Sequence, residues 1–319
     1  MNRNYNIAFV GLGSIARRHI KNVCGHVASC GNTYTLDLYR SSLERPLEEE
    51  IKPFISAIYP YAKEVVRDYD MVFVTNPTSF HLDAALKFRP HTKALFIEKP
   101  VFDGFQVGGN VIKLLDEIPS YVACPLRYNP VLQYVKHNID PAVVFSVRAM
   151  SSSYLPDWRP GQDYRQTYSA HADLGGGVDI DLIHEWDYLT WLFGMPTACQ
   201  SLVGKYSNLE IDSNDTALYI ATNQRLSFEL HLDYFGRKAQ RTLDIFTQDE
   251  TIQCDLVTGT ITYLKQGKTI VVNAERNAYQ MAEMRHFFDI VDGQAENDSN
   301  VEHGMKVLKL TKGIIQYDE

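Results

Sequence analysis

A lysine at the end of a buried strand is the first candidate for chemistry in this sequence. The apolar run 93–97 predicts a strand, and Glu98, Lys99 and Pro100 follow it directly. Open α/β sheets bind ligands at the carboxyl ends of their strands, where Lys99 would then lie. A lysine there can exchange a proton with a ligand, and a cis turn at the proline would direct its side chain. The alternative is a surface lysine before a turn.

A second candidate follows three glycines in the second half of the chain. Glycines 175–177 precede a stretch that predicts a helix from about residue 178 to residue 194. On this helix Asp181, His184 and Trp191 would share one face. An Asp–His pair can hold a hydroxyl and pass on its proton, and the glycines would let a ligand approach the backbone. The alternative is a helix cap with a core histidine.

The chain begins with an apolar strand that ends in a G-x-G-x-x-A turn before a helix. Gly11 permits the tight turn, Gly13 lets the backbone approach a pyrophosphate, and Ala16 lets the helix pack closely on the strand. The helix N-terminus, with Ser14 and Ile15, would face the phosphates. This context predicts a dinucleotide site, and the alternative is a tight turn without a ligand.

The end of the second predicted strand, 34–39, bears on which dinucleotide is bound. An NAD site usually carries an acid there for the ribose 2′-hydroxyl, but Asp37 lies inside the strand. Arg40, with Ser41 and Ser42, could bind a 2′-phosphate, because a guanidinium fits phosphate geometry. We therefore expect NAD(P)(H), with NADP favoured over NAD. The alternative is an arginine at a strand end in solvent.

Polar residues also follow the next predicted strand, 69–74. Thr75, Asn76 and Pro77 form a loop that could lie along a cofactor, and His81 opens the helix after it. Strands and helices alternate throughout this part of the chain, which predicts a doubly wound parallel sheet.

Together these motifs resemble those of the glucose–fructose oxidoreductase / inositol dehydrogenase / rhizopine-catabolism (Gfo/Idh/MocA) family. The resemblance covers nearly the whole chain and implies a nicotinamide-dependent oxidoreductase. The residues predicted to bind the cofactor are Gly11, Gly13, Ser14, Ile15, Arg40, Ser41, Thr75, Asn76, Pro77, His81, Glu98 and Lys99.

The pattern changes after residue 124, where 125–130 resembles the family's R-[FY]-N-P junction. We predict a Rossmann domain over 1–124 and an α+β domain over 125–319. Alternating strands between 197 and 272 predict a large, open, mainly antiparallel sheet in the second domain. By resemblance this domain binds substrate and forms a homodimer or homotetramer through the open sheet. The resemblance also implies that its last helix, about 300–319, packs back near the first domain.

The segment after the glycines resembles the family's G-G-G-x-x-x-D-x-x-x-H motif with one departure. Only Leu182 and Ile183 separate Asp181 from His184, where the family usually has three residues. Both spacings keep one helical face. Asp179 or Asp187 could instead be the important acid.

An aromatic and basic loop, 154–172, is the candidate cover for a polar substrate. Aromatic rings stack on sugar faces, and arginines bind carboxylate or phosphate. The alternative is a purely structural loop. The residues predicted to bind substrate are Arg127, Tyr128, Asn129, Trp158, Arg165 and His184.

Composition excludes several other classes of function. A net charge of −8 argues against nucleic acid or an anionic membrane as partner. Five scattered cysteines and the absence of a His-Glu-x-x-His pattern predict neither a disulfide framework nor a metal site. Without a recognisable signal peptide or membrane span, we expect a cytoplasmic protein.

The sequence thus predicts hydride transfer between a nicotinamide and a hydroxyl or keto carbon of a sugar derivative, with acidic or nucleotide-linked sugars included. Lys99 would stabilise the reacting oxygen, His184 would carry the proton, and Asp181 would orient His184 or grip a neighbouring hydroxyl. The alternatives are a dinucleotide-binding sensor without turnover and a glycosidase or lyase that recycles its nicotinamide.

Overall fold

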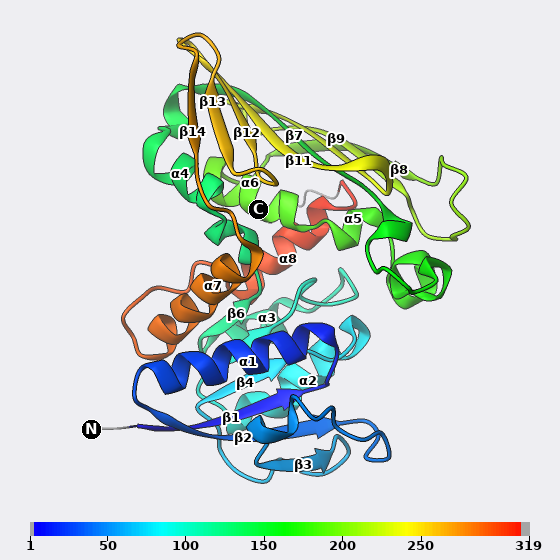
Figure 1. Cartoon of the computed structure of the whole chain (residues 1–319), viewed down its shortest axis with the longest axis vertical. Coiled ribbons are helices and arrows are strands. Elements are labelled where there is room, and N and C mark those ends of the chain that lie inside the picture. Colours follow the sequence, from blue (N-terminus) through cyan, green and yellow to red (C-terminus); the bar gives the residue numbers. More distant parts are fainter. Residues whose placement is uncertain (1–2, 314–319) are drawn as a thin grey trace. The chain divides into compact units, whose positions relative to one another are not determined.

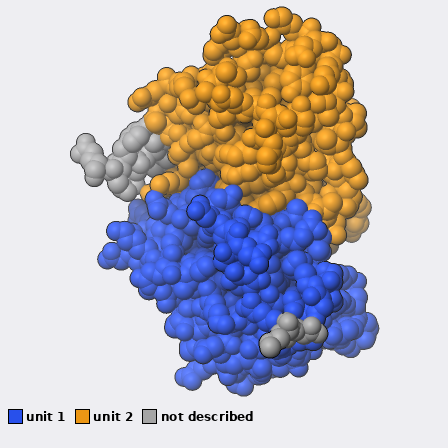
Figure 2. Space-filling model, turned by 90° about the vertical axis from the view of Figure 1, so that its left-hand side faces the viewer, with its two compact units in different colours: residues 1–123, 281–305 blue, residues 124–280, 306–319 orange. Residues whose placement is uncertain are grey.

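The computed structural model describes residues 3–313 and contains two compact units, coloured separately in Figure 2. The first unit contains the residues up to Ala123 together with Met281–Met305. The second contains Cys124–Gln280 and the residues from Lys306 onward. The sequence predicted a single division near residue 124, whereas the first unit also includes a late segment of the chain. Residues 314–319 of the predicted last helix lie outside the described part.

The first unit is built on a six-stranded parallel sheet with the order β3-β2-β1-β4-β5-β6. Its strands are β1 (Asn4–Val10), β2 (Thr33–Arg40), β3 (Ala57–Pro60), β4 (Met71–Val74), β5 (Leu95–Ile97) and β6 (Ser120–Val122). Its helices include α1 (Ser14–Ser29), α2 (His81–Phe88) and α3 (Gly109–Asp116). The predicted doubly wound parallel sheet is confirmed, and strand order reverses at β1 and β4, where such folds bind ligands. Figure 1 shows α1 running beside this sheet.

Burial explains why the central strands form where the apolar runs predicted them. The residues of β4 and β5 are all buried, as a sheet covered on both faces requires. Phe9 of β1 stacks on Phe73 of β4 with ring centroids 4.5 Å apart. The short β3 was not predicted, because it has only four residues and ends in a proline, which argues against a strand.

Aromatic packing accounts for the late segment in the first unit. Helix α7 (Arg276–Val291) carries Phe287, whose ring lies 5.6 Å from that of Phe73 and 5.3 Å from that of Phe96. The backbone amide of Val122 donates to the carbonyl of Ser299 at 2.7 Å. Helix α8 (Val301–Leu310) begins there, with Asp116 accepting from the amide of Val301. These contacts tie the segment to β4, β5 and β6.

The second unit is built on an eight-stranded sheet with the order β14-β13-β12-β11-β7-β10-β9-β8. Its strands are β7 (Val144–Tyr154), β8 (Ala198–Gly204), β9 (Thr216–Thr222), β10 (Ser227–Asp233), β11 (Phe235–Thr247), β12 (Thr251–Asp255), β13 (Thr260–Tyr263) and β14 (Lys268–Val271). Neighbouring strands are antiparallel except for the parallel pair β7 and β10. The prediction of a large, mainly antiparallel sheet is confirmed.

Helices cover one face of this sheet, as Figure 1 shows for α4 (Pro130–Asn138) and α6 (His184–Phe193). Trp186 of α6 packs its ring 5.3 Å from Tyr219 of β9 and 6.3 Å from Phe228 of β10. On the opposite face, Arg148 of β7 pairs with Glu229 of β10 at 2.9 Å, and both side chains are exposed. That open face is available to a second copy of the chain, so assembly through it stays a prediction.

Candidate active-site residues in the two units

The turn between β1 and α1 is shaped by its neighbour in the sheet. Gly11 adopts a φ of 90°, and its amide donates to the carbonyl of Tyr39 at 2.8 Å. A Cβ atom on Gly11 would lie 2.7 Å from the Cα atom of Asn76. The hydroxyl of Thr75 donates to the carbonyl of Val10 at 3.0 Å, which holds the two strand ends together. Gly11 is therefore required by the fold itself.

Gly13 has a different environment, because a Cβ atom there would meet open space. It is the N-cap of the 16-residue helix α1, whose first turn holds no acidic residue and receives no side-chain cap. Unsatisfied amides and the helix dipole make such an end favourable for an anion. Ser14 is exposed at this end, and Ile15 is half-buried beside it. These residues fit the pyrophosphate of a dinucleotide.

The structure accounts for the acid that the sequence placed inside the second strand. Asp37 is fully buried, and it accepts from the hydroxyl of Tyr69 at 2.9 Å and pairs with Arg67 at 3.1 Å. Both contacts go to Oδ2, and the buried carboxylate lies inside the strand, not at its end. Arg40 ends β2 at that edge with a half-buried side chain, and Ser41 after it is exposed.

His81 links the loops that follow β4 and β5. It is 1 % exposed, with Nδ1 3.0 Å from the carbonyl oxygen of Pro100 and Nε2 3.0 Å from that of Asn76. Burial lowers the pKa of His81, against the opposing effect of these carbonyls and of Glu98. Pro77, between the linked residues, is exposed. The side chain of His81 thus fixes the two loops from inside.

Lys99 lies directly after β5, as predicted, and it is half-buried, with a cis peptide bond to Pro100. Glu98 before it is buried, and its Oε1 lies 2.5 Å from Nε2 of His19. Its Oε2 accepts from the backbone amide of Lys99 at 3.2 Å. Burial opposes ionisation of Glu98, but the hydrogen bond and charge of His19 and the charge of Lys99 outweigh it and lower the pKa of this carboxyl.

Sequence reasoning missed His19 as a partner of the lysine motif. The available signal was a histidine within the apolar stripe of α1, between Ala16, Ile20 and Val23, which are all buried. A histidine on such a stripe needs a polar partner from a neighbouring element. The sequence could not say that this partner is Glu98.

The predicted continuous helix from residue 178 to 194 is wrong. Helix α5 covers Val178–Asp181 and α6 begins at His184, with a tight turn at Leu182 and Ile183 between them. The amide of Ile183 donates to the carbonyl of residue 180, three positions back rather than four. Apolar residues are buried on both sides of the break, so the hydrophobic pattern did not reveal it.

Asp181 is held by tyrosines from two other segments of the second unit. Its Oδ1 accepts from the hydroxyl of Tyr168 at 2.6 Å, and its Oδ2 accepts from that of Tyr234 at 2.6 Å. Desolvation of the hydroxyls, together with the charge of Asp181, raises the pKa of both tyrosines. Both phenols therefore remain protonated donors to Asp181 at neutral pH.

The two alternative acids face cations. Asp187 accepts from Nε and Nη2 of Arg127 at 2.9 and 2.6 Å, and this arginine is 1 % exposed. Asp179 is fully buried and pairs with Lys312. A carboxylate engaged by a buried or nearby cation is a structural ion pair first, so both residues have a role within the fold.

The other predicted substrate residues lie at separate places in the second unit. Asn129 caps α4 by accepting from the amide of residue 131 at 2.9 Å, and Tyr128 precedes it with a half-buried side chain. Arg165 is exposed and pairs with Asp163 at 2.9 Å. Trp158 donates to Ser153 at 2.8 Å.

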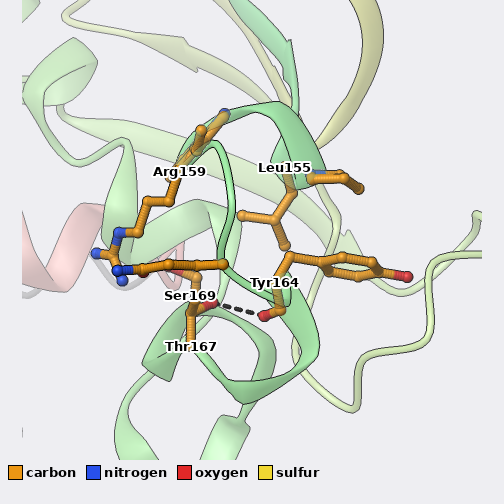
Figure 3. Close-up of a pocket in the computed structure, with 8 residues that line it drawn as sticks. Leu155, Arg159, Tyr164, Thr167 and Ser169 are labelled. Carbon is orange, nitrogen blue, oxygen red and sulfur yellow. Dashed lines mark hydrogen bonds between the residues drawn. The ribbon is translucent and has the colours of Figure 1, made fainter.

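The aromatic loop contains a small hollow, shown in Figure 3, lined by Leu155, Pro156, Trp158, Arg159, Gln162, Tyr164, Thr167 and Ser169. The hydroxyl of Thr167 donates to the carbonyl of Tyr164 at 2.7 Å and closes the loop on itself. The cavity volume is about 10 Å³, which suits roughly one water molecule. The hollow is too small for a sugar.

Within residues 3–313, no group of three or more His, Cys, Asp or Glu side chains is arranged to hold a metal ion. None of the helices in this range has the length and apolar character needed to cross a membrane.

Residues 5–122 match the model of the Gfo/Idh/MocA family, described as an oxidoreductase family with an NAD-binding Rossmann fold. Over these residues the family resemblance stated above is confirmed, together with the Rossmann fold that the model describes. No curated protein matches the chain.

Several solved structures share the fold of both units. UDP-N-acetylglucosamine 3-dehydrogenase from Acidithiobacillus ferrooxidans is 18 % identical with a TM-score of 0.78, covering 97 % of this chain and 96 % of that one. Levoglucosan dehydrogenase in complex with NADH and levoglucosan is 14 % identical with a TM-score of 0.83, covering 98 % and 96 %. The WlbA dehydrogenase from Bordetella pertussis, in complex with NADH and UDP-GlcNAcA, is 15 % identical with a TM-score of 0.77, covering 98 % and 95 %.

Proposed function

We propose that this chain, whose residues 5–122 belong to the Gfo/Idh/MocA oxidoreductase family, is a nicotinamide-dependent dehydrogenase or reductase of a sugar derivative. The observation that carries the proposal is Gly13, where a Cβ atom would meet open space. No contact within the fold excludes a larger residue at this position. Lys99 follows β5, two strands from β1 at the same carboxyl edge of the sheet. The proposed dinucleotide site and the proposed catalytic lysine would therefore lie at the same edge of the sheet.

The bound nicotinamide would supply hydride transfer. The residues of the chain would stabilise the charge on the reacting oxygen and transfer its proton. Lys99 would donate a hydrogen bond to the reacting oxygen and stabilise its negative charge. His184 would take the hydroxyl proton or return it, because the ordinary pKa of histidine lies near neutral pH.

Asp181 would grip a substrate hydroxyl or orient His184. The two tyrosine donors support this role, because they fix both carboxylate oxygens and keep the group in one orientation.

For the substrate, we propose a sugar or sugar derivative, with nucleotide-linked sugars as the first class to test. Two of the structural neighbours carry UDP-sugar names or ligands, and another carries levoglucosan. Trp158 and Arg165 remain candidates for contacts outside the reacting ring. Arg127, Tyr128 and Asn129 would support the site through the fold, because Arg127 is engaged by Asp187 and Asn129 caps α4.

For the cofactor, we propose a preference for NADP over NAD. Asp37 is committed to Tyr69 and Arg67, so it does not serve a ribose 2′-hydroxyl. Arg40 and Ser41 instead follow β2 at the edge of the sheet, where a 2′-phosphate would be placed.

Thermal unfolding with oxidised and reduced NAD and NADP tests the proposal first. A ligand at a hundredfold excess over its dissociation constant stabilises the fold by about 2.7 kcal/mol, which raises the unfolding midpoint. Absorbance assays with UDP-sugars and free sugars then follow with the dinucleotide that binds. Failure of all four dinucleotides to shift the midpoint, with none already bound by mass spectrometry, would refute the proposal. Binding without any turnover would favour the sensor alternative.

A further inference from the structure

A buried histidine–carboxylate pair lies directly behind the lysine motif, and the proposed chemistry does not use it. His19 of α1 is 1 % exposed and Glu98 after β5 is 8 % exposed. Their atoms Nε2 and Oε1 lie 2.5 Å apart. Burying an ionisable pair is costly unless both members are well bonded, so such a pair needs an explanation.

The carboxylate of Glu98 has two different partners on its two oxygens. One oxygen meets the side chain of His19, and the other accepts from the backbone amide of Lys99 at 3.2 Å. A single buried group therefore connects helix α1 with the backbone that carries the lysine. The ring of His19 packs edge-on against Phe96 at 5.0 Å, which restricts its rotation.

A second buried histidine holds the other side of the lysine. Nδ1 of His81 lies 3.0 Å from the carbonyl oxygen of Pro100, and its other ring nitrogen reaches the loop after β4. The residues on either side of Lys99 are thus bound to elements deep in the first unit. Lys99 itself, between these two bound residues, is half-buried.

We propose that His19 is a positioning residue for Lys99. Through Glu98, His19 couples helix α1 to the backbone of Lys99, the predicted catalytic lysine. The N-terminus of the same helix carries Gly13, the proposed site of pyrophosphate binding. This inference rests on the proposed function for its consequence in turnover, but the coupling itself is a property of the first unit. It assigns Glu98 a supporting role behind Lys99 in place of a direct contact with the dinucleotide.

The test compares two substitutions of His19 with a control on the same helix. His19→Leu removes the donor to Glu98, His19→Gln can still place an amide donor near it, and Val23→Ala removes buried packing without touching the pair. We expect His19→Leu to lower kcat at least about tenfold with a dinucleotide Kd within about threefold of wild type. His19→Gln should recover most of kcat, and Val23→Ala should change neither quantity.

A second readout does not depend on turnover. Hydrogen exchange of the peptide spanning 96–102 should be faster in His19→Leu than in wild type, because the Lys99 amide loses its fixed acceptor. It should be unchanged in Val23→Ala. This readout separates the coupling between His19 and Lys99 from the proposed dehydrogenase function. It tests the coupling even if the wild-type chain shows no dehydrogenase activity.

Two results would overturn the inference. One is unchanged exchange at 96–102 in His19→Leu, and the other is a fall in kcat no larger than that of Val23→Ala. If His19→Leu does not fold, Glu98→Gln replaces it in the test. This variant keeps the volume of the Glu98 side chain and removes the negative charge that pairs with His19. The same two results with Glu98→Gln would then reject the coupling.

Discussion

Glycines precede a helix at two places in this chain, and the two turns use them differently. In the first unit, Gly11 is crowded by the backbone of the loop after β4, whereas Gly13 faces open space. In the second unit, a Cβ atom on Gly176 would collide with the carbonyl oxygen of Tyr168 and lie 2.7 Å from that of His171. The second turn is therefore filled by its own chain at this glycine.

The difference separates glycines that the fold requires from glycines that a ligand would require. Gly176 needs no ligand to explain it, because the aromatic loop already occupies the space. No steric contact within the fold requires a glycine at Gly13, the N-cap of α1, so close approach of a phosphate gives a reason for it that crowding does not. The first turn is thus the stronger evidence for binding, although glycines precede a helix in both.

The crowded glycine should give the largest effect. We expect Gly176→Ala to lower the free energy of unfolding by about 2–4 kcal/mol, since backbone carbonyls must move to admit the methyl group. Gly175→Ala is the matched control: its φ of 80° is strained for alanine but its Cβ would meet open space, so about 1–2 kcal/mol is expected. Urea unfolding of both variants measures the difference, and equal losses would show that sterics do not distinguish the two positions.

Tyr168 and Tyr234, which hold Asp181 at the end of α5, also differ in how closely the protein surrounds them. Tyr234 is fully buried, whereas Tyr168 is 42 % exposed. Tyr234→Phe leaves one buried carboxylate oxygen without its donor, so we expect a loss of about 1–3 kcal/mol in unfolding free energy. Tyr168→Phe should cost less, because the Tyr168–Asp181 hydrogen bond is only partly buried, whereas the Tyr234–Asp181 bond is buried. Chemical denaturation of both variants checks this order, and a larger loss for Tyr168→Phe would contradict it.

The sequence predicted well where one local pattern determines the structure. The glycine turn, the buried run before Lys99 and the alternating strands of the second unit each carry their own signal, and the parallel and antiparallel sheets followed from them. The strands β3 and β8 were missed, because their side chains are all exposed or half-buried and no buried face marks them.

Contacts between distant segments were not accessible to the same reasoning. Nothing local to His19 identifies Glu98 as its partner, and nothing local to Asp181 identifies Tyr234. The break between α5 and α6 was hidden for a related reason: residues on both sides of it are buried, so helical and broken chains share one hydrophobic pattern. Tertiary packing decided these features.

A substitution of Gly13 tests whether this glycine is required by a ligand and not by the fold. Gly13→Ala adds a methyl group where the chain leaves space, so we expect its unfolding free energy to change by less than about 1 kcal/mol. Dinucleotide affinity should fall at least about tenfold, because the backbone could no longer approach a pyrophosphate closely. Fluorescence titration with the reduced dinucleotide measures this, and unchanged affinity would place Gly13 with the glycines that need no ligand.

Arg40 should give the smallest effect, and one that depends on the cofactor. Arg40→Ala removes a cation at the end of β2, where a 2′-phosphate would lie, so NADP affinity should fall by about tenfold or less. NAD lacks that phosphate, so its affinity should change by less than about twofold. Paired titrations of wild type and variant with both dinucleotides give the ratio directly. Equal losses for the two would mean that Arg40 acts through the turn at Gly11, whose amide is bound to the adjacent Tyr39, and not through the 2′-phosphate.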